Sequence, residues 1–296
     1  MSGPAKARAL GALVVGGILL GCSPILVRVS ELGPIATAFW RLALAMLPLT
    51  LFFARRGAGG GPVPSTMPQH LTAALPGVFL AGDLAAWHTS LHMTSVTNST
   101  LLANMAPIVV TLASWLFLRQ RISGRFIAAL VLSIVGVVVL NGASMFGRGD
   151  TGVHASHLSG DAVALGAATF YAGYFIFLSR ARAVFSTPVV MLWSTTAAAF
   201  CVLPMAVLFE HAFLPHTIAG WVVLLGLGWL VHAGGQGLIA FSLAWLPATF
   251  SSLTLLIQPV VAAVLAWLVL SEPLRTPQVI GGAVVLAGIL LARRSA

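Results

Sequence analysis

Ten stretches of about 20 mostly apolar residues run through the chain, separated by short polar or Pro/Gly-rich breaks. A helix needs about that many apolar residues to cross the hydrocarbon core of a bilayer. No segment shows the alternating pattern of a membrane-spanning barrel strand. The sequence therefore predicts an all-α integral membrane protein with ten transmembrane helices. These spans are expected at residues 9–28, 34–54, 71–91, 96–118, 124–142, 159–180, 186–209, 217–241, 247–270 and 276–293.

The composition excludes a water-soluble enzyme. Of the 296 residues, 59% are apolar and 7% are charged, whereas soluble domains carry about 25% charged residues. So few charges could not cover a surface that faces water. The mean hydropathy of +1.02 indicates the same lipid environment.

The basic residues predict how the spans are oriented. The net charge is +9, but the arginines are scattered singly or in twos and threes, so no nucleic-acid partner is expected. Arg and Lys collect on the cytoplasmic side of inner-membrane proteins. We therefore expect a multi-pass protein of the bacterial inner membrane with both termini in the cytoplasm. The basic residues then on the cytoplasmic side are Lys6, Arg8, Arg55, Arg56, Arg119, Arg121, Arg125, Arg180, Arg182, Arg293 and Arg294.

The N-terminal segment has two interpretations. Lys6 and Arg8 precede an apolar run whose end, Leu19 to Cys22, resembles a bacterial lipoprotein cleavage box. The run continues past Cys22 through residues 25–27, and the repeat described next includes it, so we interpret it as the first span. The only other cysteine, Cys201, also lies in an apolar run, so no disulfide framework or Cys-rich metal site is expected.

The chain repeats itself at an offset of 152 residues. The matched pairs of the less common residue types are Pro107 with Pro259 and Trp115 with Trp267. The second span matches instead at an offset of 156, as a loop of different length would require.

Each half of the repeat contains five spans. The expected halves are residues 1–145 and 146–296. Because five is odd, the second half crosses the membrane in the opposite direction, and such inverted repeats are typical of secondary transporters.

Several short motifs carry a resemblance to a known family. They are Ile257-Gln258-Pro259 through Trp267, Leu270-Ser271-Glu272, Gly281 to Gly288, and Trp40-Arg41-Leu42. With the five-plus-five repeat, they resemble the drug/metabolite transporter superfamily, and the EamA-type permeases look closest. The resemblance implies a permease for small metabolites, often an exporter, with amino-acid exporters as the favoured branch. The chain departs from the family pattern at Gln120, where the first repeat usually carries the counterpart of Glu272.

Two ionisable side chains are predicted inside the membrane. Asp83 lies midway along the third span, and Arg41 lies about two turns into the second. A buried charge in lipid must be paired, shielded or functional. One interpretation is an ion pair that locks the two spans; a second is that Asp83 binds a substrate amine or couples transport to protons; a third is a solvated cavity. Trp87 follows Asp83 at i+4 and shares its face, so it is either a substrate contact or a packed aromatic.

The fourth span carries a polar face at helical spacing. Asn104 and Thr100 lie on it with Pro107, which frees a backbone carbonyl near mid-membrane. The face either lines a cavity or joins neighbouring helices by hydrogen bonds. Its residues are Thr97, Thr100, Asn104, Pro107, Thr111 and Ser114.

The second half offers neutral polar side chains to the same pocket. Gln258 precedes Pro259 in the ninth span, so each half has an amide near its proline. The sequence predicts a pocket for an amphipathic small molecule such as a zwitterion, with Gly234 and Gly235 serving packing or a hinge and Arg41, Pro107 and Pro259 in structural or gating roles. The predicted substrate-binding residues are Asp83, Trp87, Thr100, Asn104, Tyr171, Tyr174, His232, Gln236 and Gln258.

No cofactor or metal is expected. The chain has no phosphate-binding loop, which leaves gradient-driven antiport or facilitated diffusion. His88 and His92 are spaced for a metal, but no third ligand is evident. A cationic drug is an alternative substrate. A membrane enzyme using His157 and Asp161 is an alternative class. The expected partners are a small-molecule substrate and the lipid bilayer, with the chain a monomer or homodimer.

Overall fold

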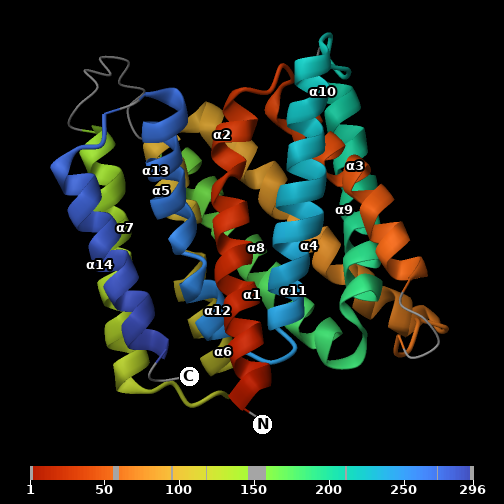
Figure 1. Cartoon of the computed structure of the whole chain (residues 1–296), viewed down its shortest axis with the longest axis horizontal. Coiled ribbons are helices and arrows are strands. Elements are labelled where there is room, and N and C mark those ends of the chain that lie inside the picture. The colour runs from red at the N-terminus through yellow and green to blue at the C-terminus, as the bar shows by residue number, and fades with distance from the viewer. Residues whose placement is uncertain are drawn as a thin grey trace.

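A computed structural model describes residues 3–55, 60–94, 96–117, 119–145, 158–210, 212–271 and 273–293. The regular elements of these residues are all helices (Figure 1). In chain order they are α1 (Gly3–Gly21), α2 (Ser23–Arg28), α3 (Pro34–Ala54), α4 (Met67–Met93), α5 (Val96–Ala103), α6 (Ala106–Leu116), α7 (Gly124–Met145), α8 (Leu158–Val184), α9 (Thr187–Phe209), α10 (Ile218–Leu225), η1 (Gly226–Gln236), α11 (Gly237–Ser242), α12 (Ala248–Thr254), α13 (Ile257–Leu270) and α14 (Thr276–Arg293).

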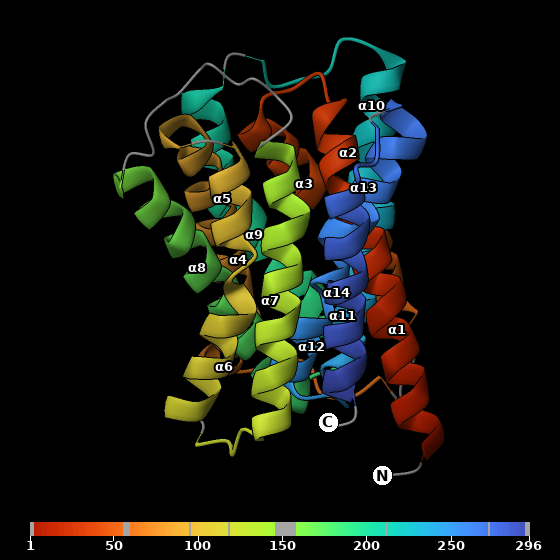
Figure 2. The ribbon, with the colours of Figure 1, turned by 90° about the vertical axis from the view of Figure 1, so that its left-hand side faces the viewer.

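These helices confirm the predicted all-α membrane fold. Among the described residues, nine helical stretches are long and apolar enough to cross a membrane. The third predicted span, α4, is 27 residues long but is too polar to be among them. It lies between α8 and α9, so its polar residues face protein on both of these sides. Both termini lie at one end of the bundle in both views (Figures 1 and 2), as an even number of spans requires.

Basic residues gather at the end of the bundle that carries the termini. The helix directions place this end at the start of α1, α4 and α7 and at the finish of α3, α6, α8 and α14 (Figure 2). Arg56 and Arg294 lie outside the described residues. The described basic residues at this end are Lys6, Arg8, Arg55, Arg119, Arg121, Arg125, Arg180, Arg182 and Arg293.

Helix packing follows the inverted repeat. The contact of α4 with α8 has its counterpart in the contact of α1 with η1 and α11. Likewise α5 and α6 pack on α8, as α13 and α12 pack on α1. The helices related to each other by the repeat, α7 and α14, lie side by side at one edge of the bundle (Figures 1 and 2). The two halves therefore have the same internal arrangement.

Glycines allow α7 and α14 to approach closely. A Cβ on Gly136 would lie 2.6 Å from the backbone nitrogen of Val285, and one on Gly281 would lie 2.7 Å from the carbonyl oxygen of Gly136. The residue equivalent to Gly136 in the second half, Gly288, packs in the same way against the backbone of α7. Small residues at a crossing let membrane helices pack by van der Waals contact.

The helix ends also repeat. Among the described residues, the only non-glycine positions with positive φ are Arg119 at 50° and Ser271 at 55°. Such values are uncommon outside glycine. The two positions are 152 residues apart, and both follow the helix that contains the repeat's proline, so the same left-handed turn ends the fourth and ninth spans.

The prolines break both of these spans near their middle. The fourth span divides into α5 and α6 around residues 104–105, and the ninth divides into α12 and α13 around residues 255–256. Pro107 and Pro259 lie in the first turn of the second helix in each case. The predicted release of backbone groups near mid-membrane is thus observed as a short turn that interrupts the α-helix in each span.

The eighth span contains a feature that the sequence did not predict. Its central 11 residues form a π-helix, η1, instead of an α-helix. Short π-helical insertions are often found at functional sites. This segment carries His232 and Gln236 and is where the second half faces the site described next.

Candidate functional site: a buried polar cluster

A cluster of polar side chains lies in the middle of the bundle. Arg41 of α3 and Asp83 of α4 act electrostatically on each other and on Tyr171 and Tyr174 of α8. Arg41 also acts on His232 of η1. The structure therefore brings together five of the predicted residues, from both halves of the chain.

Arg41 is held by a hydroxyl rather than by the acid. Its Nη1 donates to the Ser23 Oγ at 3.2 Å, and its Nε is buried without a hydrogen-bond partner. No direct ion pair between Arg41 and Asp83 occurs among the interactions of the described residues, so the two charges attract each other through space. A guanidinium with a free, buried N–H is suited to binding a carboxylate.

A small cavity reaches Arg41. It has a volume of about 70 Å³ and lies between α2, the first turns of α3 and the second half of α4. This volume holds a few water molecules, since one water needs roughly 10–15 Å³, and it is well below the ~300–1,000 Å³ of ordinary ligand pockets. The cavity lies in the half of the bundle away from the termini. Its polar or aromatic lining residues are Ser23, Thr37, Arg41 and Trp87.

The second half supplies a neutral hydrogen-bonding wall. Gln236 Nε2 donates to the Tyr174 hydroxyl at 3.1 Å, and the Gln258 side chain lies close to the Tyr171 hydroxyl. His232 Nε2 lies 2.9 Å from the Thr195 hydroxyl of α9.

Two atoms of this wall lack partners. His232 Nδ1 and Gln236 Oε1 are buried without a hydrogen bond among the described residues. Unpaired buried polar atoms cost free energy and call for a water or a ligand.

The π-helix determines which residues of the eighth span face the cluster. Both His232 and Gln236 are almost fully buried at 1% exposure, but they reach different neighbouring helices. Gly235 packs against α1, because a Cβ there would lie 2.6 Å from the Leu20 side chain. Gly234 has ordinary contacts at 3.4 Å or more, so of the two glycines it is Gly235 that a close crossing requires.

The side-chain amide of the fourth span, Asn104, does not join the cluster. Asn104 Nδ2 donates to the Thr100 carbonyl of its own helix at 2.9 Å, and Thr111 donates to the Pro107 carbonyl at 2.7 Å. Thr100 and Asn104 remain half-buried. In the described structure the side-chain amides near the two prolines therefore differ. Gln258 joins the cluster, whereas Asn104 hydrogen-bonds the backbone of its own helix.

Sequence reasoning missed three hydroxyls that the structure places at the site. They are Ser23 and Thr37 beside Arg41, and Thr195 beside His232. The signal for Ser23 was its position next to Pro24 inside an apolar run. The side chains of His88 and His92, as well as Glu272 and His157, lie outside the described residues.

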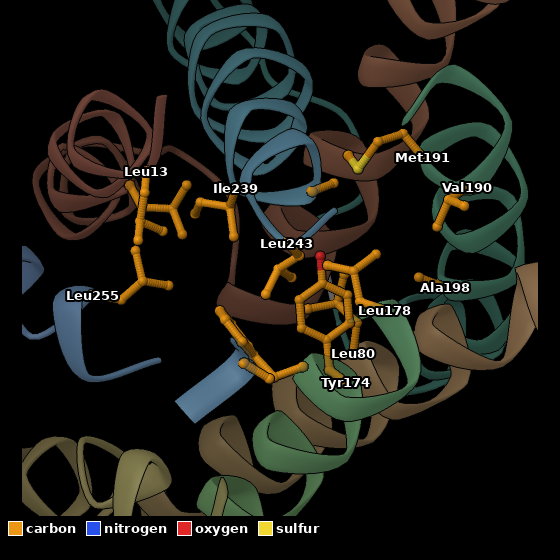
Figure 3. Close-up of a cluster of buried hydrophobic side chains, with 14 of the residues drawn as sticks. Leu13, Leu80, Tyr174, Leu178, Val190, Met191, Ala198, Ile239, Leu243 and Leu255 are labelled. Atoms are coloured by element: carbon orange, nitrogen blue, oxygen red, sulfur yellow. The ribbon is translucent and has the colours of Figure 1, made fainter. Parts of the chain in front are cut away.

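An apolar layer separates the cluster from the end that carries the termini. Figure 3 shows Leu80, Leu178 and Leu243 beside the Tyr174 ring, with Ile239 and Leu13 farther along the same apolar cluster, and all five are at most 6% exposed. Arg182 links α8 to α11 at this layer. Its guanidinium donates hydrogen bonds to the Ala240 carbonyl, at 2.8 Å, and to the Phe185 carbonyl.

Two acidic residues close the opposite end. Glu31, before α3, accepts hydrogen bonds from the Thr217 hydroxyl and from the backbone N–H groups of His216 and Thr217, at the start of α10. These bonds hold the pKa of Glu31 below its ordinary value. Glu210, before α10, accepts from the backbone N–H of Ile35 at 2.8 Å in the first turn of α3. Each acid thus caps the helix that follows the other acid.

Aromatic side chains reinforce this closure. The Trp40 ring packs against Phe213 and Trp221 at centroid distances of 5.7 and 5.1 Å, and its Nε1 donates to the Phe213 carbonyl at 2.6 Å. Packed side chains therefore lie between the polar cluster and each end of the bundle.

Two inverted halves around a polar cluster define the architecture of a membrane transporter. A family model described as the EamA-like transporter family matches the chain twice, over residues 7–142 and 158–294. The chain belongs to this family and is a transporter rather than an enzyme. Asp161, the acid of the alternative enzymatic site, instead accepts a hydrogen bond from the Thr94 hydroxyl at 2.7 Å.

Two relatives and one solved structure are similar over most of the chain. An "Uncharacterized transporter" of Archaeoglobus fulgidus is 24% identical and covers 96% of this chain and 95% of its own. A "Probable terminal-alkyne amino-acid exporter" of Streptantibioticus cattleyicolor is 26% identical and covers 85% of this chain and 83% of its own. A crystal structure of a protein 17% identical covers 100% of this chain and 99% of that one with a TM-score of 0.82, and it shares the fold.

Proposed function

We propose that this transporter exports small zwitterionic metabolites, with neutral and aromatic amino acids as the substrate class, across the bacterial inner membrane. The observation that carries the proposal is the pair of opposite charges in the cluster, Arg41 and Asp83, which share one site in the middle of the bundle without a direct ion pair. A relative named as a probable amino-acid exporter supports the same class.

The site offers one complementary group to each end of an amino acid. The free N–H of Arg41, with the hydroxyl of Ser23 nearby, suits the carboxylate. The Asp83 carboxylate suits the ammonium group. A bound zwitterion would then neutralise both charges while excluding water. Pairing of this kind lowers the free-energy cost of a charge inside a membrane protein.

Transport follows by alternating access around this site. The apolar layer beside Tyr174 and the Glu31–Glu210 closure would open in turn, each by movement of one half against the other. With the basic end placed in the cytoplasm, both termini are cytoplasmic, and export begins with opening of the apolar layer.

The test is counterflow with purified protein in vesicles. Vesicles loaded with each of a panel of unlabelled amino acids are diluted into radiolabelled substrate, with and without an imposed pH gradient. Saturable uptake of neutral or aromatic amino acids supports the proposal. A panel that is silent throughout, with protein that is folded and inserted, rejects the substrate class.

The variant Asp83→Asn separates binding from coupling. We expect uptake to fall and any effect of the pH gradient to disappear. If transport survives with unchanged pH dependence, Asp83 does not couple transport to protons. The matched control is Asp161→Asn, which removes an acid that bonds Thr94 outside the cluster.

The second candidate substrate is an amphipathic cation. The observation that favours it is the position of Trp87, which lines the cavity one helical turn after Asp83, because a carboxylate and an indole face together bind cations. The two candidates differ at Arg41, since a substrate without a carboxylate gains nothing from it. Competition by an amino-acid ester, which lacks the carboxylate charge, distinguishes them.

A further inference from the structure

A second cavity lies at the basic end of the bundle, outside the polar cluster. It has a volume of about 300 Å³ and is formed where the turn between α6 and α7 meets the turn between α11 and α12. The cavity therefore lies between the two halves. Arg121, Gln120 and Ser123 line it from the first half, and Pro247 and Thr249 line it from the second.

The charge of this region is unbalanced. Arg121 is exposed and lines the cavity, while Arg119 and Arg125 flank it along the chain and are also exposed. The Arg121 side chain makes no hydrogen bond or ion pair with the described residues. None of the described acidic residues lies at this end, since Glu31, Asp161 and Glu210 are at the opposite end and Asp83 is in the cluster. The described residues therefore supply no counter-charge to this cavity.

A bilayer-facing surface leads into the same turn. Leu112, Trp115 and Leu116 form one stripe on α6 and are 56%, 60% and 62% exposed. Phe117, at 75% exposed, continues the stripe to the turn. Large apolar side chains at this exposure face the acyl chains, and a tryptophan near a helix end is typical of the membrane interface.

We propose that this cavity binds the headgroup of an anionic phospholipid from the leaflet at the basic end, with its acyl chains on the α6 stripe. Arg121 pairs with the phosphate, and Gln120, Ser123 and Thr249 offer hydrogen bonds to the phosphate and glycerol oxygens. Basic pockets between transmembrane helices on the cytoplasmic side are suited to such headgroups. The volume exceeds by far the roughly 10–15 Å³ that one water needs. Because the cavity joins the two halves, the lipid would link them at this end.

The experiment measures lipid binding to the full-length purified protein. The protein is held in zwitterionic phosphatidylcholine discs, phosphatidylglycerol is titrated in, and bound lipid is counted by native mass spectrometry together with the thermal unfolding midpoint. We expect saturable phosphatidylglycerol binding that Arg121→Gln weakens about fivefold, the equivalent of about 1 kcal/mol for one basic residue near the surface. Arg121→Lys is expected to retain most of the affinity.

The matched control removes the same charge elsewhere on the same end. Arg55 is exposed and does not line the cavity, so Arg55→Gln should leave the affinity within twofold of the wild type. Equal losses in Arg55→Gln and Arg121→Gln would mean diffuse attraction and would overturn the site. Thr249→Val, on the other wall, is expected to weaken binding by a smaller factor.

A soluble anion is tested separately. Glycerol phosphate carries the same headgroup chemistry without acyl chains, and we expect it to give no stabilisation at concentrations where phosphatidylglycerol saturates. Equal stabilisation by glycerol phosphate would assign the cavity to a soluble phosphate and overturn the lipid proposal.

Discussion

The two halves of the molecule share a backbone arrangement but not a chemistry. Arg41 and Asp83, the two ionisable groups of the cluster with full charges, both come from the first half, and their equivalents in the second half are Ala197 and Gly235. The second half contributes tyrosines, a histidine and amides. The repeat therefore accounts for the shared backbone arrangement, whereas the proposed substrate site depends on positions at which the two halves differ.

Removal of the positive charge of Arg41 should have the largest effect on transport. A hydrogen bond to a charged group contributes about 1.5–3 kcal/mol, so loss of the proposed contact with the substrate carboxylate in Arg41→Gln is expected to lower counterflow at least about 10-fold. The variant should also be less stable, because it leaves Asp83 without an opposite charge.

The double variant Arg41→Gln with Asp83→Asn sharpens this test. It should regain thermal stability because no unbalanced charge remains, yet stay inactive. Full activity in the double variant would show that the charges serve folding alone and that the asymmetry of the halves is not the basis of binding.

Disruption of the crossing between α7 and α14 should have the next largest effect. Gly281→Val places a side chain against the backbone of α7, where a Cβ already lies 2.7 Å from the Gly136 carbonyl. Overpacking of this kind costs about 1–3 kcal/mol, so the unfolding midpoint should fall. Gly136→Val should behave alike, because the crossing is shared by the two halves. Gly166→Val, where a Cβ meets nothing within 4 Å, is the control that should match the wild type.

Substitutions of Asn104 and Gln258, whose side-chain amides lie near the two prolines, should differ in their effect on substrate affinity. The sequence predicts that Asn104→Ala and Gln258→Ala each weaken substrate binding. The structure sharpens this prediction, because Gln258 lies close to Tyr171 of the cluster, whereas Asn104 hydrogen-bonds the backbone of its own helix. We expect about a 2- to 13-fold loss of affinity for Gln258→Ala, the equivalent of one hydrogen bond at about 0.5–1.5 kcal/mol, and a smaller loss for Asn104→Ala. A larger loss for Asn104→Ala would place the site nearer α5.

The smallest effect is expected on thermal stability, when Glu31 is protonated at low pH. Hydrogen bonds from Thr217 and His216 lower the pKa of Glu31 in the folded protein, so its contribution to stability is present above the unfolded value of about 4.3 and is lost as pH falls through the lower folded value. The unfolding midpoint of the wild type should drop by more than that of Glu31→Gln between about pH 6 and pH 3. Parallel curves for the two proteins would contradict the role of this carboxylate.

Much of the fold was predictable because lipid imposes strong rules on sequence. Every backbone group in the hydrocarbon must be bonded within a helix, so apolar runs of sufficient length could be placed within a few residues. The third span was also predicted, although α4 is the most polar of the ten, because the breaks on either side delimit it. The paired Pro107 and Pro259 predicted where two spans would lose backbone bonds.

The site was predictable only in part. Arg41, Asp83, Tyr174 and Gln236 lie together in the structure, and the sequence suggested such a grouping because polar groups in apolar spans must find partners. Their partners were not predictable, since a hydrogen bond between two helices depends on how each is rotated. Ser23 and Thr195 were missed for the same reason, because a hydroxyl in a span equally often bonds its own backbone.

The number of spans, their inverted repeat and the gathering of basic residues at one end could be predicted, because these features depend on runs of residue types along the chain. Which side chains meet depends instead on how the helices pack. The π-helix changes the direction in which His232 and Gln236 point, and the close crossings at Gly235 and Gly281 set the spacing between helices. Such contacts follow from rotation and packing in three dimensions, which residue types along one chain do not specify.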